Sequence, residues 1–350
     1  MYAQDIMQKK SEFDDDFFKP KIAVVGVGGG GNNTIHRLSS IDIKGASLYA
    51  LNTDGKQLSM LPSNISSIML GREITSGLGA GGYPEVGERA AELTRDKIAE
   101  IVRDKNLVFV TAGMGGGTGT GASPVVARIA KEQGAIVVGI VTTPFSLERV
   151  RLNTAKSGIS KLRENLDTLI IIDNNRLVKL YPNLPIEKTF RLADEITAKA
   201  VRGITETITQ PSLMNLDFAD VRSIMGIGGF SVICVGGASG HDRADEVVKS
   251  TMNNKLLDVN VENAKGVLFH ITGGTDLTLG EATRIGTKLT ESVSDNAYVC
   301  WGARLDPSYK DQVEVIAIFT GVSGSDFDAG KKDDTELSWS RLSQRPRFMD

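Results

Sequence analysis

Short, continuous apolar runs recur along the first half of the chain, and each is followed by glycine or polar residues. Such runs are typical of strands that are buried on both faces of a parallel sheet. Helical patterns lie between them, including an amphipathic one over 88–103, and a long glycine-rich loop covers 71–87. Because strands alternate with helices, the pattern predicts a doubly wound, Rossmann-like α/β fold. The predicted strands are 21–25, 47–51, 65–70, 107–111, 136–141 and 169–172.

The second half begins with one long helical pattern, from 187 to 209, which the pair Gln210-Pro211 ends. Two shorter helices follow, at about 242–255 and 278–293. The long helix is therefore predicted to join the first α/β domain to a smaller α/β domain with a four-stranded sheet. The strands of this sheet are predicted at 230–235, 267–271, 298–302 and 313–319.

These patterns divide the chain into five segments. Both ends are polar, so we expect them to be flexible. The predicted segments are an N-terminal arm (1–20), a first domain (21–186), a central helix (187–210), a second domain (211–322) and a C-terminal tail (323–350).

The composition and charge of the chain exclude some classes of function. The 350 residues carry a net charge of −3, so no basic footprint for nucleic acid stands out. No apolar run reaches the roughly 18 residues of a membrane span, and the start has no signal-peptide pattern. Cys234 and Cys300 lie in apolar runs and are predicted to be buried thiols, and the three histidines have no zinc spacing. We expect a cytoplasmic protein without direct membrane insertion, and the sequence leaves the identity of any metal-ligating residues unknown.

Three glycine clusters carry the candidate chemistry. One, 113–121, follows the strand at 107–111; the others are 26–31 and 77–82. Glycines let backbone N–H groups approach phosphate oxygens, and a following helix points its positive end at them. The cluster at 26–31 matches Gly-x-Gly-x-x-Gly, which alone would suit an NAD-dependent oxidoreductase. Three clusters at one sheet edge, without a P-loop lysine, instead favour a bound polyphosphate.

The motif Gly113-Met-Gly-Gly-Gly-Thr-Gly-Thr-Gly121 resembles the signature loop of the tubulin/FtsZ superfamily. Further segments resemble FtsZ in the same order and extend the likeness over 21–322. FtsZ, the cell-division form, fits better than tubulin, and the paired Asn32-Asn33 resembles the archaeal type. These further segments are Gly26–Asn33, Asn52–Asp54, Gly77–Gly81, Thr143–Phe145, Phe190–Glu195 and Asn215–Asp220.

The resemblance implies that 21–186 binds GTP or GDP and that 211–322 is a GTPase-activating domain. The loops would contact the nucleotide through Gly28, Gly29, Gly30, Gly31, Asn32, Asn33, Asn52, Asp54, Gly79, Ala80, Gly81, Gly115, Gly116, Gly117, Thr118, Gly119, Thr120, Thr143, Pro144 and Phe145.

Further positions match family residues that contact ribose, phosphate or base. Glu148 and Arg151 match an acidic and a basic contact; the segment is one residue shorter than the family pattern, so Arg149 is an alternative to Arg151. Asn174 would face the base, and Phe190 would stack on guanine.

Asp194 lies four residues after Phe190, on the same helix face. Its carboxylate would accept hydrogen bonds from guanine N1–H and N2–H. Adenine has no donor at N1, so the same group would reject ATP.

Asn215, Asp217 and Asp220 follow the long helix, and alone they would be interpreted as helix-capping or surface polar residues. About 23 helical residues span roughly 35 Å, so these three residues cannot reach the pocket of their own chain. The resemblance implies that a second molecule, stacked head to tail, brings them over the neighbour's nucleotide as catalytic groups, with Mg²⁺ and a monovalent cation such as K⁺.

The predicted function is a GTPase whose head-to-tail homopolymer forms the division ring at mid-cell. A tubulin-like filament for cell shape or plasmid movement is the alternative, and an NAD-binding oxidoreductase a distant one. The tail, whose end mixes basic and apolar residues over 340–350, is predicted to bind a membrane-anchoring adaptor.

Overall fold

The computed structural model describes most of the chain, in three stretches: 19–209, 217–253 and 260–322. The predicted arm (up to residue 18), the predicted tail and the candidate residue Asn215 lie outside the described residues. Four segments are left undescribed: 1–18, 210–216, 254–259 and 323–350.

The described strands form one sheet in the order β3-β2-β1-β4-β5-β6-β7-β10-β8-β9. In chain order they are β1 (Ile22–Val27), β2 (Ala46–Asn52), β3 (Ser66–Met69), β4 (Leu107–Gly113), β5 (Ile136–Thr143), β6 (Thr168–Asp173), β7 (Phe230–Ser239), β8 (Gly266–Gly273), β9 (Tyr298–Leu305) and β10 (Gln312–Val322).

The first six strands are all parallel, and their order is that of a dinucleotide-binding sheet. β1 lies in the middle, paired with β2 on one side and β4 on the other. The six strands predicted from apolar runs are found, and β4 and β5 extend past those runs to Gly113 and Thr143. The predicted α/β fold class is therefore confirmed.

The helices differ from the prediction at several places, two of which lie between β3 and β4. The pattern over 88–103 is two helices, because the Thr94 hydroxyl donates to the Ala90 carbonyl and accepts from the Gly71 amide, and the chain turns there. The predicted loop 71–87 contains α4 and the start of α5. The helices are α2 (Gly28–Ser40), α3 (Gly55–Ser59), α4 (Arg72–Thr75), α5 (Pro84–Leu93), α6 (Arg95–Val102), α7 (Thr118–Glu132), α8 (Arg149–Arg163), α9 (Asn174–Leu180), α10 (Ile186–Thr209), α11 (Phe218–Met225), α12 (Arg243–Asn253) and α13 (Leu279–Thr290), with a 3₁₀ turn η1 (Pro307–Tyr309).

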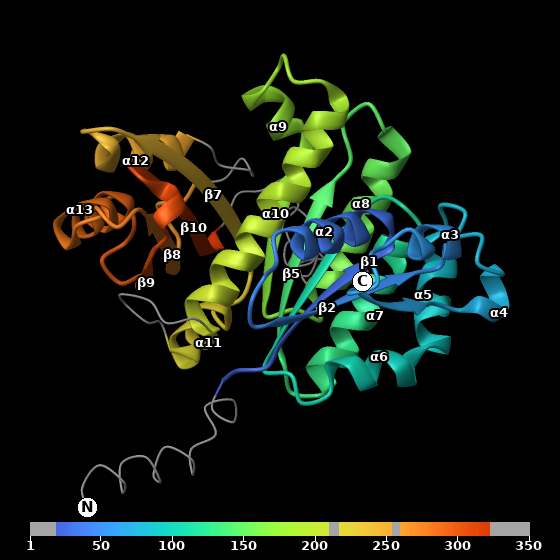
Figure 1. Cartoon of the computed structure of the whole chain (residues 1–350). Helices are drawn as coiled ribbons and strands as arrows, with labels where there is room; N and C mark the ends of the chain where they lie inside the picture. The colour runs from blue at the N-terminus through green and yellow to red at the C-terminus, as the bar shows by residue number, and fades with distance from the viewer. Residues whose placement is uncertain (1–18, 210–216, 254–259, 323–350) are drawn as a thin grey trace, which may run out of the picture.

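The long central helix α10 lies between the two halves of the molecule (Figure 1). Its apolar side chains, such as Ile196 and Val201, are buried in a core shared with the parallel sheet. Its polar side forms ion pairs with the second half, where Lys199 meets Glu314 and Glu206 meets Arg304. The same core includes Leu268 and Ile316 of the second half, so the helix connects the halves both by packing and by charge.

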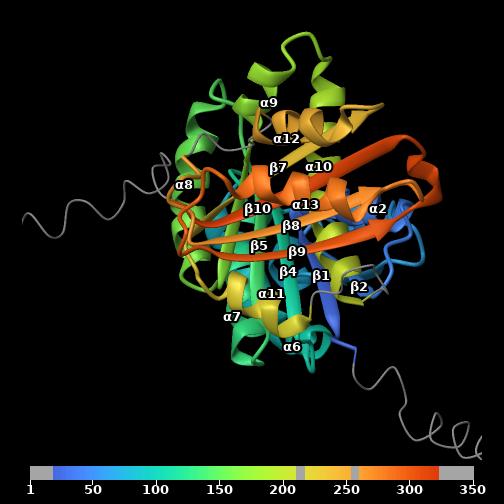
Figure 2. The same ribbon diagram turned by 90° about the vertical axis from the view of Figure 1, so that its left-hand side faces the viewer.

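The second half is a mixed sheet of four strands. β10 pairs antiparallel with β7 and β8, and β9 runs parallel to β8. Helices α12 and α13 cover one face of these strands (Figure 2). Only the pairs Leu169–Phe230 and Ile170–Ser231 join β6 to β7, so the two halves share one sheet through a narrow connection.

Successive residues of the central strands enter cores on opposite faces of the sheet. Val24 belongs to the core under α2 and α10, whereas Val25 belongs to the core under α5 and α7. Since side chains alternate along a strand, both faces need apolar residues. This explains why the strands appear in the sequence as continuous apolar runs.

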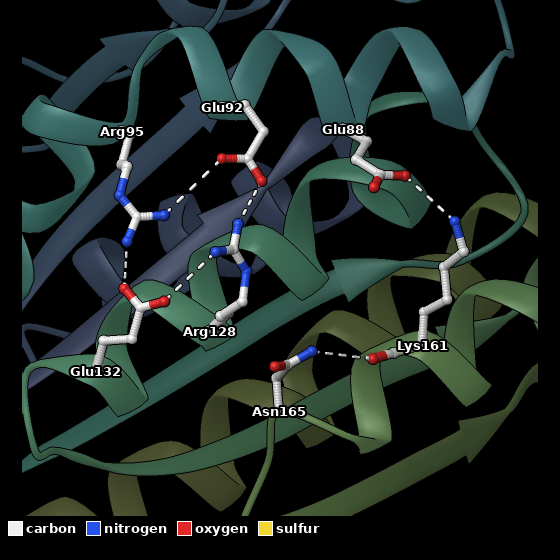
Figure 3. A network of polar contacts seen from close by, with 7 residues as sticks. All are labelled: Glu88, Glu92, Arg95, Arg128, Glu132, Lys161 and Asn165. Carbon is white, nitrogen blue, oxygen red and sulfur yellow. Dashed lines mark hydrogen bonds and ion pairs between the residues drawn. The ribbon is translucent and has the colours of Figure 1, made fainter.

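Ion pairs connect helices on the outer side of the first half of the molecule (Figure 3). Glu92 of α5 and Glu132 of α7 alternate with Arg95 of α6 and Arg128 of α7 in a closed ring. Each side chain is about 40% exposed, so a single pair contributes little to stability. The ring nevertheless links α7, whose first turn lies within the glycine motif, to α5 and α6.

Cys234 and Cys300 are buried and free of disulfide bonds, as predicted. Within the described stretches, no helix is both long and apolar enough to cross a membrane. The same stretches hold no group of three His, Cys, Asp or Glu side chains arranged to bind a metal ion.

Candidate nucleotide site and acid loop

The glycine loops after β1 and β4 contact each other at the carboxyl edge of the sheet. The two strands are parallel neighbours, with Val27 paired to Ala112, so α2 and α7 begin at the same edge. A Cβ added to Gly28 would come within 2.8 Å of the Gly119 amide nitrogen. The N-terminal turns of both helices, with their free N–H groups, therefore lie side by side.

The third glycine cluster lies against the same loops. A Cβ on Gly117 would come within 2.8 Å of the Ala80 Cβ, and the Gly79 amide donates to the Thr53 carbonyl at 3.1 Å. Gly79 and Gly81 have φ values of +92° and +59°, which favour glycine. All three clusters are thus gathered into one site.

Gly116 differs from its neighbours in the signature motif. Side chains at Gly117 and Gly119 would collide with protein atoms, so packing alone explains those glycines. A Cβ on Gly116 would meet nothing within 4 Å, and its φ is not positive. Neither packing nor backbone conformation requires glycine there, and close approach of a ligand to the backbone is the reason that remains.

Several predicted polar ligands are buried and hold the loops in place. Asn32, with its amide oriented to suit its neighbours, donates to the carbonyls of Gly26 and Gly28 and accepts from Asn52 Nδ2 at 3.0 Å. The Thr120 hydroxyl accepts from the Gly115 amide at 2.8 Å. All three side chains are at most 3% exposed. In this structure they brace the backbone that faces the site.

The Thr118 hydroxyl, which is half-buried, lies 2.6 Å from the hydroxyl of Thr53. Sequence reasoning missed Thr53, although it occupies the middle of the Asn52–Asp54 motif. Asp54 caps α3 by accepting from the amides of Lys56 and Gln57.

Gln57 is a second residue that sequence reasoning missed. Its side-chain oxygen accepts from Asn52 Nδ2 at 2.9 Å, and it lies 3.0 Å from the position of a Cβ on Gly29. No motif marks Gln57, so only the fold reveals that it lies beside the first glycine loop.

Glu148 and Arg151 form an ion pair of 2.9 Å at the start of α8. The other Glu148 oxygen accepts from the Phe145 amide at 3.1 Å. A Cβ on Gly115 would lie 2.8 Å from the Arg151 carbonyl oxygen, so the backbone of Arg151 is in contact with the signature loop. Arg149 is exposed and makes no comparable contact among the described residues, which favours Arg151 of the two alternatives.

The loop that carries Pro144 and Phe145 is held by Asn175, which sequence reasoning also missed. Asn175 Oδ1 accepts from the Ser146 amide at 2.7 Å and from the Ser146 hydroxyl at 2.8 Å. Thr143 is buried and its hydroxyl donates to Asp173 Oδ1 at 3.2 Å. This segment therefore has a fixed shape next to Glu148 and the start of α10.

Two aromatic rings meet at the predicted base end. Phe145 and Phe190 pack edge to face with their ring centroids 5.2 Å apart. Phe145 is buried, whereas Phe190 is 46% exposed and so offers a free ring surface, unlike a core aromatic. Asn174 is nearly buried, and its Oδ1 accepts no hydrogen bond from the residues that the structure describes.

A cavity of about 440 Å³ opens between α2 and α10. Asn33 and Asp194, both predicted nucleotide contacts, line it together with His36, Arg37 and Arg191. Burial raises the pKa of the Asp194 carboxyl to about 6, although a hydrogen bond from Thr34 and the charge of Arg37 lower it. Cavities of this size accommodate small-molecule ligands.

The acids lie beyond the other end of α10, at the start of α11 (Figure 1). Asp217 caps α11 by accepting from the Asp220 amide at 2.8 Å. Asp217 is exposed and Asp220 is half-buried. The structure therefore brings these two acids together, far from the glycine loops.

Comparison with known proteins defines the class. A model of the GTPase domain of the Tubulin/FtsZ family matches residues 21–182, and one of the FtsZ family C-terminal domain matches residues 229–323. "Cell division protein FtsZ 2" of Halobacterium salinarum is 54% identical over 311 residues, which cover 89% of this chain and 79% of the relative. The protein of the same name from Methanocaldococcus jannaschii is 53% identical, with 88% and 82% covered.

Solved structures of FtsZ proteins agree with this family assignment. An empty FtsZ dimer from M. jannaschii superposes with a TM-score of 0.85 at 41% identity, covering 91% of this chain and 92% of the other. CetZ2 of Haloferax volcanii, at 18% identity and a TM-score of 0.72, shares the fold only. The chain belongs to the FtsZ family of cell-division GTPases.

The predicted class is thus confirmed: the protein binds guanine nucleotide and hydrolyses GTP. The two relatives named above are archaeal proteins, in line with the archaeal character of the sequence motifs. Family membership decides against the NAD-dependent oxidoreductase that the first glycine loop alone allowed.

Proposed function

We propose that this GTPase assembles head to tail into protofilaments that build the division ring, with each active site shared between two subunits. One observation carries the proposal: the candidate nucleotide residues and the acids lie at opposite ends of α10. From Phe190 to Thr209 alone the helix extends about 28 Å. The acids of one chain therefore do not reach its own pocket, whereas a neighbour stacked in the same orientation supplies them.

Such an interface joins two different surfaces, so it repeats into an open filament. The solved FtsZ dimer of M. jannaschii supports self-association in this family. A nucleotide buried in the joint adds contacts between subunits, and loss of the γ-phosphate removes some of them. GTP hydrolysis would then loosen the filament.

The phosphates would lie along the backbone amides at the starts of α2 and α7. Gly116 and the neighbouring glycines would allow close approach, and Thr118 would donate a hydroxyl hydrogen bond. Glu148 and Arg151 would contact the ribose and phosphate side. The buried Asn32, Asn52 and Thr120 would act mainly by holding these loops in shape.

The base would stack on the exposed Phe190 ring, with Asn174 and Asp194 at its polar edges. Asp194 would accept from guanine N1–H and N2–H. Because adenine lacks the N1 donor, it would leave a desolvated carboxylate without its partner, so the pocket would select GTP over ATP.

Asp217 and Asp220 would orient and polarise the water that attacks the γ-phosphate of the neighbour, helped by Asn215. Oδ2 of both carboxylates carries no hydrogen bond from the described residues, so each acid has an oxygen available for this role. Two carboxylates beside phosphate oxygens would offer the oxygen ligands that Mg²⁺ takes in proteins. The bound cation would neutralise phosphate charge, and K⁺ would use oxygen ligands in the same way.

The working domain boundaries are 21–186 for GTP binding, 187–210 for the central helix and 211–322 for the activating domain. The narrow β6–β7 connection and the extents of the two family models support this division. We place the filaments in the cytoplasm at mid-cell, anchored by an adaptor that binds the tail. Deleting 340–350 is expected to leave the GTPase rate intact and to abolish membrane recruitment.

The test of the shared site is the GTPase rate per molecule as a function of protein concentration, measured beside sedimentation of filaments. We expect the rate to be very low where nothing sediments and to rise once filaments form. A rate that stays flat down to concentrations without filaments would show that each chain holds a complete site. Electron microscopy should show protofilaments with GTP and none with GDP.

A further inference from the structure

The hydroxyl of Tyr298 is in contact with one of the two acids. Tyr298 is the first residue of β9, and Asp220 lies in the first turn of α11, 78 positions away in the sequence. The hydroxyl donates to Asp220 Oδ1 at 3.0 Å. The Asp220 amide in turn donates to Asp217 Oδ1 at 2.8 Å, so the three residues form a short chain of hydrogen bonds.

This contact fixes a side chain that would otherwise rotate. The terminal torsion of an aspartate is broad, so a carboxylate without a hydrogen-bond partner has no strongly preferred direction. A hydrogen bond to one oxygen restricts the direction of the other. With Oδ1 held by Tyr298, Asp220 Oδ2 has a defined position on the surface that the neighbouring subunit would meet.

Burial does not explain why the tyrosine is there. Its side chain is 46% exposed, and β9 would be formed equally well by another β-favouring residue at this edge position. A tyrosine hydroxyl keeps its proton and remains a donor at neutral pH, and the hydrogen bond to Asp220 raises the pKa of the Tyr298 phenol further.

We propose that Tyr298 is a positioning residue for GTP hydrolysis, which holds the Asp220 carboxylate in the orientation that acts on the neighbour's γ-phosphate. The inference rests on the proposed shared site. In this role Tyr298 acts through the Asp220 carboxylate, which its hydroxyl contacts. It therefore contributes to turnover by the filament and not to GTP binding by the subunit.

The test is Tyr298→Phe in the full-length chain, which removes the hydroxyl and keeps the ring. We expect the maximal GTPase rate in filaments to fall about five-fold, as for loss of one partly exposed hydrogen bond to a charged group. GTP affinity, the protein concentration at which filaments appear and the thermal midpoint should stay as in the parent. An unchanged maximal rate overturns the inference.

The chain offers a matched control in Tyr309. Its hydroxyl also donates to a carboxylate, Glu314 Oε1 at 3.3 Å. This pair lies beside α10 and away from Asp217 and Asp220. Tyr309→Phe removes the same kind of bond and should leave the maximal rate unchanged. An equal loss of rate in both variants would mean that Tyr298 matters only for the general structure of this half, and the inference would fail.

A double variant separates the inference from the shared-site proposal on which it rests. With Asp220→Ala already slow, adding Tyr298→Phe should cause no further loss, because the tyrosine acts through that carboxylate. A further five-fold loss contradicts positioning of Asp220. If Asp220→Ala itself keeps the parent rate, the shared site is wrong; if it is slow while Tyr298→Phe is normal, only the role of Tyr298 is wrong.

Discussion

The two ends of α10 are constructed in different ways. At the nucleotide end, glycine loops pack directly on one another, and buried side chains such as Asn32 and Thr120 hold their backbone from within. At the other end, Asp217 is exposed on a short helix. Its neighbour Asp220 is held by one hydrogen bond from Tyr298.

This difference indicates that one end of α10 serves GTP binding and the other serves GTP hydrolysis. A preformed pocket binds its ligand without a large ordering cost, so the single subunit should already bind GTP. Exposed acids are useful only when a second molecule covers them, because electrostatic and proton-transfer catalysis gain strength where water is excluded. Variants at the two ends should therefore separate binding from turnover.

The largest effect is expected at the acid end. Asp217→Ala and Asp220→Ala should each lower the GTPase rate by about 100-fold or more, since a positioned general base contributes about 10² to 10⁴. GTP affinity should not change, because the acids lie at the far end of α10 from the pocket. Filaments should form with GTP and persist, and sedimentation over time would measure this.

Asp242→Ala provides the control for the loss of an acid in this half of the chain. Asp242 is exposed, before α12, and should not affect the GTPase rate. Loss of GTP affinity in the Asp217 or Asp220 variants would contradict the separation of the two ends.

At the pocket end, Gly116→Val should weaken GTP binding by about 10- to 100-fold, as expected when hydrogen bonds to a charged group are blocked. The protein itself has room, because a Cβ at Gly116 meets nothing within 4 Å. The thermal midpoint without nucleotide should therefore change little. Calorimetry with GTP, beside thermal unfolding of the free protein, measures both quantities.

Gly280→Val is the matched control, since Gly280 lies in the first turn of α13 with its nearest neighbour 3.9 Å from an added Cβ. It should bind GTP as the parent does. Gly117→Val would be a poor test, because its side chain would collide with Ala80 and Tyr83 and disturb the loop. Normal GTP binding by Gly116→Val would refute close backbone approach at this position.

The sequence was sufficient for the fold because its central strands are buried on both faces and appear as unbroken apolar runs. The break at Thr94 was missed, since a threonine whose hydroxyl bonds backward to Ala90 leaves the helical pattern intact. Helix α11 was missed for a different reason. It is only eight residues long, and its capping residue Asp217 was assigned a catalytic role instead of the start of a helix.

The sequence predicted which loops form the candidate site, but it did not predict which individual residues contact one another there. Glycines after parallel strands had to meet at one edge, and they do. The sequence could not distinguish a residue that faces the ligand from one that braces the loop, as for Thr120. It could not connect Tyr298 with Asp220 either, because no local pattern links positions that far apart.

The smallest and most selective effect is expected from pH at the base end. Burial raises the pKa of Asp194 to about 6, so at pH 7.5 the group is mostly a carboxylate and at pH 5 mostly protonated. Only the carboxylate accepts from both guanine donors. Affinity for guanine should therefore be full above pH 7 and decrease as pH falls through 6, by up to tenfold at pH 5.

Asp194→Asn removes this titration and keeps the shape. It should bind guanine nucleotide about tenfold more weakly at pH 7.5, for loss of a charged hydrogen bond, and show a flatter decrease toward pH 5. The nucleotide phosphates and the other side chains that line the cavity are the same in both proteins, so the ratio of the two affinities isolates Asp194. We expect that ratio to shrink toward one at pH 5, measured with GDP by calorimetry; a ratio independent of pH would show that Asp194 does not contact the base as a carboxylate.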